Sequence, residues 1–206
     1  MTIKAVIFDI GGVLVRTGDR LPRLKLAERL GMTYAELSAL VFDSPSAVQA
    51  SFGQISVQQH WEIVCQALQL PTAGWQALED EFFAGDRVDM ELVNYVRSLH
   101  LRYRTGIISN GWPNVHPSLT EKWKIGDAFD EIIISAEVGL AKPDPNIFAL
   151  AISRLSIAPA EGVFVDDFLE NVEAARKIGL HAIRFQDTAQ AIAELNQLLE
   201  QADGTD

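Results

Sequence analysis

Five short apolar runs, separated by helical patterns, constrain the fold of this chain more than any other feature. The runs are rich in β-branched and aromatic residues and occupy 3–9, 103–109, 130–135, 162–167 and 181–185. Apolar residues spaced three and four apart predict helices over 90–100, 144–154, 169–178 and 187–200. Strands that alternate with helices indicate a parallel sheet covered on both faces. We therefore expect an α/β protein with a three-layer, Rossmann-like core.

A run of helical patterns interrupts this alternation directly after the first predicted strand. The stretches LPRLKLAERLG, TYAELSALVF, SVQQHWEIVCQALQL and TAGWQALEDEFF follow one another between residues 20 and 85. They predict a small helical domain inserted into the sheet protein. We place this insert at 17–87 and the Rossmann-like core at 1–16 and 88–206.

Charge and hydropathy narrow the classes of partner. The formal net charge is −11 over 206 residues, and Lys and Arg form no basic block, so we expect no nucleic-acid partner. Apolar runs such as AVIF and IIIS are far shorter than the ~20 residues of a membrane helix. The start MTIKAVIFDIG lacks the pattern of a signal peptide, so we expect a cytoplasmic protein with no membrane partner. An acidic protein that binds an anionic small molecule needs a metal ion, a lysine or backbone N–H groups to reverse its charge locally.

Polar side chains stand just past three of the predicted strands. Asp9 follows the first strand, Ser109 and Asn110 end another, and Asp166 and Asp167 end a third. Ligands of doubly wound sheets bind outside the carboxyl ends of the strands. We therefore expect these side chains to converge at one edge of the sheet, together with Lys142 from the loop GLAKPDP.

Three converging carboxylates repel one another unless a cation or raised pKa values relieve the repulsion. Oxygen-only ligands favour a hard ion, and few protein ligands with room for water and phosphate favour Mg²⁺. Ser109 and the backbone N–H groups of Gly11 and Gly12 could hold phosphate oxygens, and Lys142 could supply positive charge. Asp9 is then a candidate nucleophile, because carboxylates can form aspartyl-phosphate intermediates.

The order of these motifs resembles that of the haloacid dehalogenase superfamily of hydrolases. That family has a strand ending in D-x-D-G-[TV], a strand ending in Ser or Thr, a lysine in a K-P-D-P-like loop, and a strand ending in paired acids. This chain has FDIGGVL, IISN, GLAKPDPNIF and VFVDDFLENVEAARKIG in the same order. The insert resembles the family's helical cap, which closes over the substrate and excludes water. The sequences of these motifs are most similar to those of glucose-1-phosphatase-like enzymes and of the phosphatase domain of soluble epoxide hydrolases.

The resemblance implies a role for each residue of the set. It makes Asp9 the nucleophile and a Mg²⁺ ligand, with the backbone carbonyl of Gly11 as a second ligand. Asp167 would bind the ion directly and Asp166 through water, although the two could exchange these roles. Ser109 and Lys142 would contact the phosphoryl oxygens, and Asn110 would contact phosphate or substrate. The implied substrate is a small phosphorylated metabolite, with a sugar phosphate as the first choice. We expect a monomer or a homodimer, between which the sequence does not decide.

Gly11 departs from the family pattern, because most phosphatases of the superfamily have an aspartate there that protonates the leaving oxygen. Such groups contribute roughly 10²–10⁴-fold to the rate. The departure leaves open a phosphatase with another proton source, a slow phosphatase, a phosphate-binding regulatory module, or a metal-independent 2-haloacid dehalogenase. Dehalogenases of the family also lack that aspartate, but they have a non-acidic sequence where this chain has VDD. Asp166 and Asp167 therefore favour Mg²⁺ and phosphate.

Four residues in or near the insert keep two interpretations each. Trp61 and Trp75 could line a substrate pocket, but aromatic residues at helical spacing more often form a core. Arg16 and Arg20 open the insert close to Asp9, and either could meet the substrate or form a surface ion pair.

Overall fold

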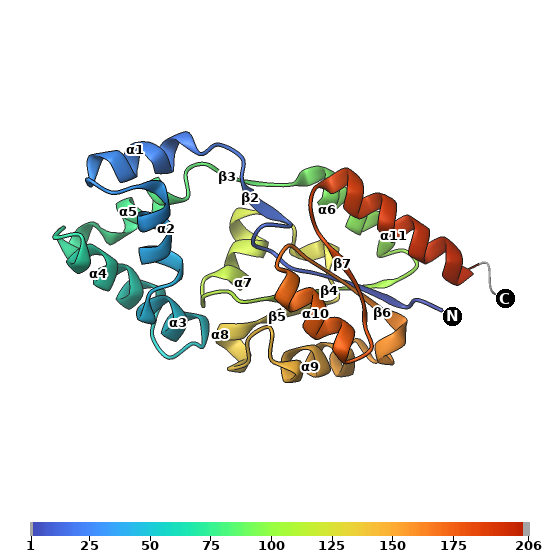
Figure 1. Cartoon of the computed structure of the whole chain (residues 1–206). Helices are drawn as coiled ribbons and strands as arrows, with labels where there is room; N and C mark the ends of the chain where they lie inside the picture. Colours follow the sequence, from blue (N-terminus) through green and yellow to red (C-terminus); the bar gives the residue numbers. More distant parts are fainter. Residues whose placement is uncertain (1, 204–206) are drawn as a thin grey trace.

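A five-stranded parallel sheet forms the centre of the protein in the computed structural model, which describes residues 2–203 (Figure 1). The strand order is β5-β4-β1-β6-β7, and every neighbouring pair is parallel. The strands are β1 (Ala5–Phe8), β4 (Arg104–Ser109), β5 (Glu131–Ile134), β6 (Gly162–Asp166) and β7 (His181–Arg184). Each falls within one of the five predicted runs. The predicted α/β, Rossmann-like fold is confirmed.

Helices cover both faces of the sheet because its central strand is apolar on both sides. Val6 and Phe8 of β1 pack in one cluster of buried residues, while Ala5 and Ile7 pack in another. The first cluster includes side chains of α6 (Met90–Leu99) and α11 (Thr188–Asp203). The second includes side chains of α9 (Pro145–Leu155) and α10 (Leu169–Lys177). This two-sided burial explains the near-continuous apolar run of the first strand.

Two connections at the carboxyl ends of the strands matter for the site. The segment after β4 contains the short α7 (Val115–Pro117), and α8 (Ser135–Val138) follows β5 directly. The loop before α9 carries Lys142, and the Asp144 side chain caps α9 by accepting a hydrogen bond of 2.8 Å from the Asn146 N–H. Pro145 occupies the first turn, where its missing N–H needs no partner. These two residues fix where the loop ends and the helix begins.

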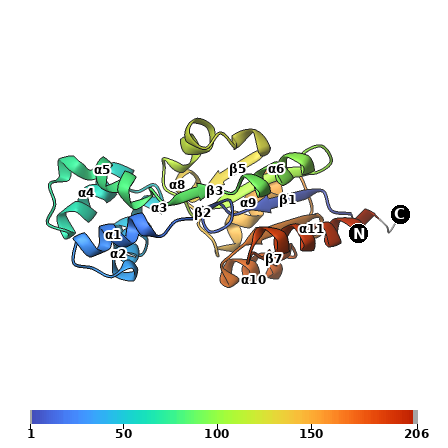
Figure 2. The same cartoon turned by 90° about the horizontal axis from the view of Figure 1, so that it is seen from above.

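The insert folds as a helical domain beside the sheet, which we call the cap (Figure 2). Its helices are α1 (Leu21–Arg29), α2 (Tyr34–Phe42), α3 (Pro45–Ser51), α4 (Val57–Ala67) and α5 (Trp75–Phe82). The four predicted helical stretches correspond to α1, α2, α4 and α5, whereas α3, with the sequence PSAVQAS, has too few apolar residues to give a helical pattern. Trp61 is completely buried in the core of the cap, and Trp75 packs against that core. Within residues 2–203, no helix is long and apolar enough to cross a membrane.

A two-stranded antiparallel ribbon joins the cap to the sheet. It consists of β2 (Val15–Thr17) and β3 (Asp86–Val88), with Arg16 opposite Arg87. Neither strand was predicted, because three residues give no measurable periodicity. We propose that the domain boundaries lie within this ribbon, between residues 16 and 17 and between residues 87 and 88.

Candidate active site

The order of the strands brings the predicted site residues together. Asp9 directly follows β1, Ser109 ends β4, and Asp166 ends β6 with Asp167 after it. Because β1 lies between β4 and β6, these side chains meet at the same edge of the sheet. One carboxylate oxygen from each of Asp9, Asp166 and Asp167 lies within 4.8 Å of the other two. The carboxylates therefore form one cluster, as the sequence predicted.

Lys142 is the cation that faces this cluster. Its Nζ lies 2.8 Å from Asp9 Oδ1 and 2.7 Å from Asp166 Oδ2, and its side chain is only 1% exposed. The Asn110 side chain holds the lysine backbone from both sides: the Lys142 N–H donates to Asn110 Oδ1, and Asn110 Nδ2 donates to the Lys142 carbonyl, each at 2.8 Å. Both polar atoms of Asn110 are thus used to position the loop that carries Lys142.

The two adjacent acids at the end of β6 differ in their hydrogen bonding. Asp166 is completely buried and accepts hydrogen bonds from Lys142 Nζ, from the Phe168 N–H at 2.8 Å and from Asn171 Nδ2 at 3.1 Å to each oxygen. Asp167 Oδ1 is buried with no hydrogen-bond partner among the described residues. The Asp167 carboxylate also packs against Gly12, where any side chain would overlap it. A buried oxygen without a donor is typical of a group that binds a ligand or an ion.

Burial changes the acidity of the cluster. It raises the pKa of Asp9 to about 6, and Lys142 opposes this shift, while Asp166 adds to it. Burial likewise raises the pKa of Asp167, with a further contribution from the negative charge of Asp166. Both pKa shifts arise mainly because burial removes the carboxylates from water, and the negative charge of Asp166 adds to them.

The donor set suits Mg²⁺. Its side-chain donors are carboxylate oxygens, three carboxylates face one ammonium group, and Asp167 Oδ1 lacks a partner among the described residues. A hard divalent ion would satisfy that oxygen and balance the remaining charge. The three clustered carboxylates therefore suit a Mg²⁺ ion.

A cavity of about 990 Å³ opens above the cluster, between the edge of the sheet and the cap. Its lining includes all the predicted site residues except the fully buried Asp166: Asp9, Gly11, Gly12, Ser109, Asn110, Lys142 and Asp167. Ser109 is buried, with 5% of its surface exposed. A side chain at position 11 would meet open space, because no atom lies within 4 Å of a Cβ built there. The structure therefore has room for an aspartate at position 11, and steric exclusion does not explain why this residue is missing.

Several residues around the cavity were not singled out from the sequence. Asn171 on α10 supports Asp166, and its position five residues further along the chain was the only signal. Glu79 of α5 lines the cavity and accepts a hydrogen bond of 3.2 Å from Asn114 Nδ2, and burial raises its pKa. Trp112, which follows the Ser109 strand, reaches into the cap and packs against its aromatic core.

The arginines near the start of the insert have different surroundings. Arg16 lines the cavity, but its guanidinium contacts Asp89 and Thr188. The Arg20 guanidinium lies over the Tyr34 ring, 4.7 Å from its centroid. Arg23, which belongs to none of the sequence motifs, is buried in α1 and lines the cavity.

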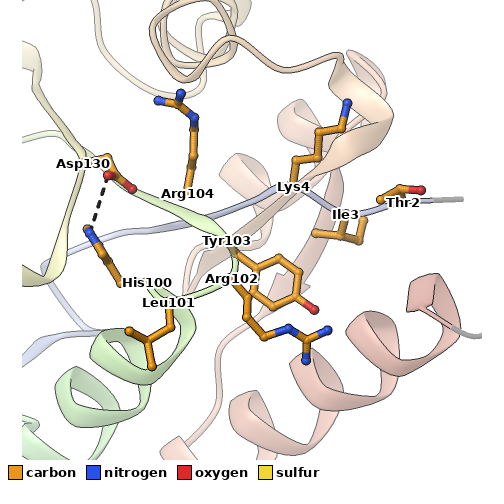
Figure 3. Close-up of a pocket in the computed structure, with 9 residues that line it drawn as sticks. All are labelled: Thr2, Ile3, Lys4, His100, Leu101, Arg102, Tyr103, Arg104 and Asp130. Carbon is orange, nitrogen blue, oxygen red and sulfur yellow. Dashed lines mark ion pairs between the residues drawn. The ribbon is translucent and has the colours of Figure 1, made fainter.

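A second, smaller cavity of about 460 Å³ lies at the opposite ends of the strands (Figure 3). Basic side chains dominate its lining, among them Lys4, Arg102 and Arg104. Its one acidic lining residue is Asp130, which faces His100 with 3.6 Å between Oδ1 and Nε2. This cavity has no carboxylate cluster, so the chemistry belongs to the larger one.

The fold and the site together define a capped α/β enzyme whose centre combines three carboxylates with a buried lysine. The model of the haloacid dehalogenase-like hydrolase family matches residues 3–179. The chain belongs to this family and is a hydrolase, which confirms the family predicted from the sequence motifs.

Curated relatives carry phosphatase names. The chain is 28% identical to a sesquiterpene phosphatase of Aspergillus oryzae, over 96% of this chain and 97% of the relative. It is 25% identical to the D-ribitol-5-phosphate phosphatase of Bacteroides thetaiotaomicron, over 96% of this chain and 98% of the relative. It is also 28% identical to the mouse acyl-CoA dehydrogenase family member 10 over 95% of its own length, but it spans only 19% of that longer protein.

The fold is shared with solved structures of the family. One is a haloacid dehalogenase-family enzyme from Bacteroides thetaiotaomicron in complex with magnesium and inorganic phosphate. Its TM-score is 0.75 at 20% sequence identity, and the match covers 92% of this chain and 98% of that chain.

Proposed function

We propose that the protein is a Mg²⁺-dependent phosphomonoester hydrolase that acts on a small phosphorylated metabolite through an aspartyl phosphate on Asp9. The observation that carries this proposal is the carboxylate cluster beneath the cap, in which Lys142 bridges Asp9 and Asp166 while Asp167 Oδ1 lacks a partner. The phosphatase names of full-length relatives support the reaction type.

The chain's own residues account for the phosphoryl-transfer steps. An oxygen of Asp9 attacks phosphorus, the bond from phosphorus to the ester oxygen breaks, and the alcohol leaves. Water then attacks the aspartyl phosphate, which releases phosphate and restores the carboxylate. Lys142 keeps Asp9 anionic for the attack and, with Ser109, holds the phosphoryl oxygens. Asn110 keeps the lysine loop in place.

Mg²⁺, when bound, would neutralise the charge of the phosphoryl oxygens. The Asp9 and Asp167 carboxylates and the Gly11 carbonyl would hold it directly, and Asp166 through water. The saturated hydrogen bonding of Asp166 and the free oxygen of Asp167 support this division.

The proton for the leaving oxygen has a different source from that of the aspartate-bearing relatives, because Gly11 has no side chain. Water can supply it, and so can a carboxyl group of the cap. Glu79 is a carboxyl that lines the same cavity and whose pKa is raised by burial.

Phosphate release tests the proposal. Wild type, Asp9→Asn and Asp127→Asn would be assayed on sugar phosphates, nucleotides and p-nitrophenyl phosphate, with Mg²⁺ or with a chelator. Asp127 is a surface carboxylate paired with Arg97 and serves as the matched control. We expect release that needs Mg²⁺, disappears in Asp9→Asn and persists in Asp127→Asn. Release that survives chelation or the Asp9 substitution would refute the mechanism.

A further inference from the structure

The part of the cavity wall that helices α2 and α3 of the cap provide is largely apolar. Four residues of α2 line it: Ala35, Ser38, Ala39 and Phe42. Their spacing of three and four residues places them along one face of the helix. Ala47, Val48 and Ser51 of α3 continue the wall, and α3 contacts α8 of the core (Figure 1). Small side chains along this face leave space above the carboxylate cluster.

Helix α2 is apolar on two faces. Leu37 and Val41 point into the core of the cap and are buried. The face with Ala35, Ala39 and Phe42 points into the cavity. An apolar face is normally covered by protein or by another apolar molecule, and here it faces the place where a substrate would lie.

Large apolar side chains from separate elements remain exposed around this cavity. The exposed fractions are 45% for Phe42, 49% for Val48 and 63% for Phe168. The Phe42 ring centroid lies 6.0 Å from that of Phe83 and 6.1 Å from that of Trp112, which also line the cavity. Aromatic groups from the cap and from the core thus form one apolar surface.

The polar groups of the cap wall are mostly engaged within the protein. Ser51 Oγ donates to the Val48 carbonyl at 2.8 Å. The Arg23 guanidinium donates to the Phe82 carbonyl, to Tyr34 Oη and to Asp86 Oδ1. A leaving group with many hydroxyls would therefore find few free partners, and buried hydroxyls without partners weaken binding. Thr17 Oγ1 donates to Asp86 Oδ1, and Glu79 Oε1 accepts from Asn114 Nδ2. Ser38, Asp43 and the second oxygen of Glu79 remain, so few polar groups of the wall are left for a substrate.

We propose that the phosphate ester accepted by this site is that of a large apolar alcohol, whose hydrocarbon part lies on the wall formed by α2, α3, Phe83 and Trp112. This inference rests on the proposed phosphatase function and specifies its substrate class. The volume of about 990 Å³ supports it, because this lies at the upper end of the roughly 300–1,000 Å³ typical of small-molecule sites. An apolar alcohol differs from the sugar phosphate that family resemblance makes the first choice.

Binding of phosphonates, whose carbon–phosphorus bond resists hydrolysis, tests the inference without turnover. Calorimetry in the presence of Mg²⁺ would compare ethylphosphonate, butylphosphonate, octylphosphonate and the hydroxylated 2,3-dihydroxypropylphosphonate on the wild-type protein. We expect octylphosphonate to bind on the order of 100-fold more tightly than ethylphosphonate, because each buried CH₂ contributes up to about fourfold. The dihydroxypropyl compound should bind no more tightly than ethylphosphonate.

A charge on the wall provides the second measurement. Ala39→Glu keeps a good helix former at an exposed position of α2 and should reduce the octyl-over-ethyl preference at least about tenfold. Leu24→Glu adds the same charge to an exposed apolar position of α1 outside the cavity and should leave the preference unchanged.

The two proposals fail in different ways. Equal affinity across the chain lengths, tightest binding of the dihydroxypropyl compound, or an undiminished preference in Ala39→Glu would each overturn the apolar substrate class. Chain-length-dependent binding without Mg²⁺-dependent phosphate release from ethyl or octyl phosphate would support the apolar wall and overturn the phosphatase. Mg²⁺-dependent phosphate release together with equal affinity for all chain lengths would support the phosphatase and overturn the apolar substrate class.

Discussion

The Lys142 Nζ lies 2.8 Å from Asp9 Oδ1 in a place where both side chains are almost fully buried. Burial by itself favours the neutral form of Asp9, and the ammonium group counteracts it. The proposed nucleophile must be an anion to attack phosphorus. This contact therefore links the stability of the buried charges to the reactivity of the site.

Replacing Lys142 with Met should destabilise the metal-free protein by about 3–5 kcal/mol, because buried carboxylates lose their cation. Mg²⁺ should restore much of this loss, since it supplies positive charge to the same carboxylates. Urea unfolding in chelator and in Mg²⁺ measures both effects. Lys25→Met, at an exposed position of α1, is the control and should change neither curve. An equal response of the two variants to Mg²⁺ would contradict the shared role of lysine and metal.

Asp167→Asn should weaken Mg²⁺ binding more than Asp166→Asn. In the proposed site Asp167 is the direct ligand, because its Oδ1 has no partner among the described residues, whereas Asp166 is held by Lys142, Asn171 and a backbone N–H. We expect Kd for Mg²⁺ to rise at least about 100-fold for Asp167→Asn and about 10-fold for Asp166→Asn, as for residues that orient ligands. Calorimetric titration of the two isosteric variants gives the comparison directly. If Asp166→Asn weakens Mg²⁺ binding more than Asp167→Asn does, then Asp166 is the direct ligand and Asp167 binds through water.

The convergence of polar residues at the sheet edge could be predicted from sequence because it depends on local features. Asp9, Ser109 and Asp166 stand at strand ends, and each strand is a recognisable apolar run. The topology of a doubly wound sheet then brings the carboxyl ends of the strands together, whatever the conformation of the connecting loops. The predicted convergence of these residues therefore needed no knowledge of the intervening chain.

The cap side of the cavity could not be predicted in the same way. Trp112 packs against Phe42 and His60, which are distant in sequence, so no periodicity connects them. The two-faced character of α2 was hidden too, because its stretch simply reads as apolar. The hydrogen bonds by which the Asn110 amide holds the Lys142 backbone were not predicted either, because they depend on the position of a loop. These relationships arise from tertiary packing.

Gly11→Asp should raise the phosphatase rate. The new side chain has open space around it and enters the cavity next to Asp9. A positioned acid contributes roughly 10²–10⁴-fold, so we expect kcat for an alkyl phosphate to rise at least about tenfold. Gly11→Asn has the same shape without an acidic proton to transfer and should not accelerate turnover. If both variants stay at the wild-type rate, the leaving oxygen already has an effective proton donor.

The protein should become less stable as the pH falls through the range in which His60 is protonated in one state only. In that range, His60 binds a proton in the unfolded chain but not in the folded protein. His60 is completely buried in the cap, its Nδ1 lies 2.9 Å from Ser46 Oγ, and its ring packs on Trp112 at 4.5 Å. Burial lowers its pKa from 6.5 to about 4. Between these two pH values unfolding takes up a proton, so acid favours the unfolded state, whereas above the upper value the contribution to stability is fully present.

His60 should therefore reduce the free energy of unfolding by at most about 1.4 kcal/mol per pH unit as the pH decreases across this window. Urea unfolding at several pH values, on wild type and on His60→Gln, measures this slope. Gln retains a hydrogen-bonding side chain but does not titrate, so its stability should decline less steeply with acid. Parallel curves for the two proteins would show that His60 binds its proton equally well in the folded cap, against the consequence expected from its burial.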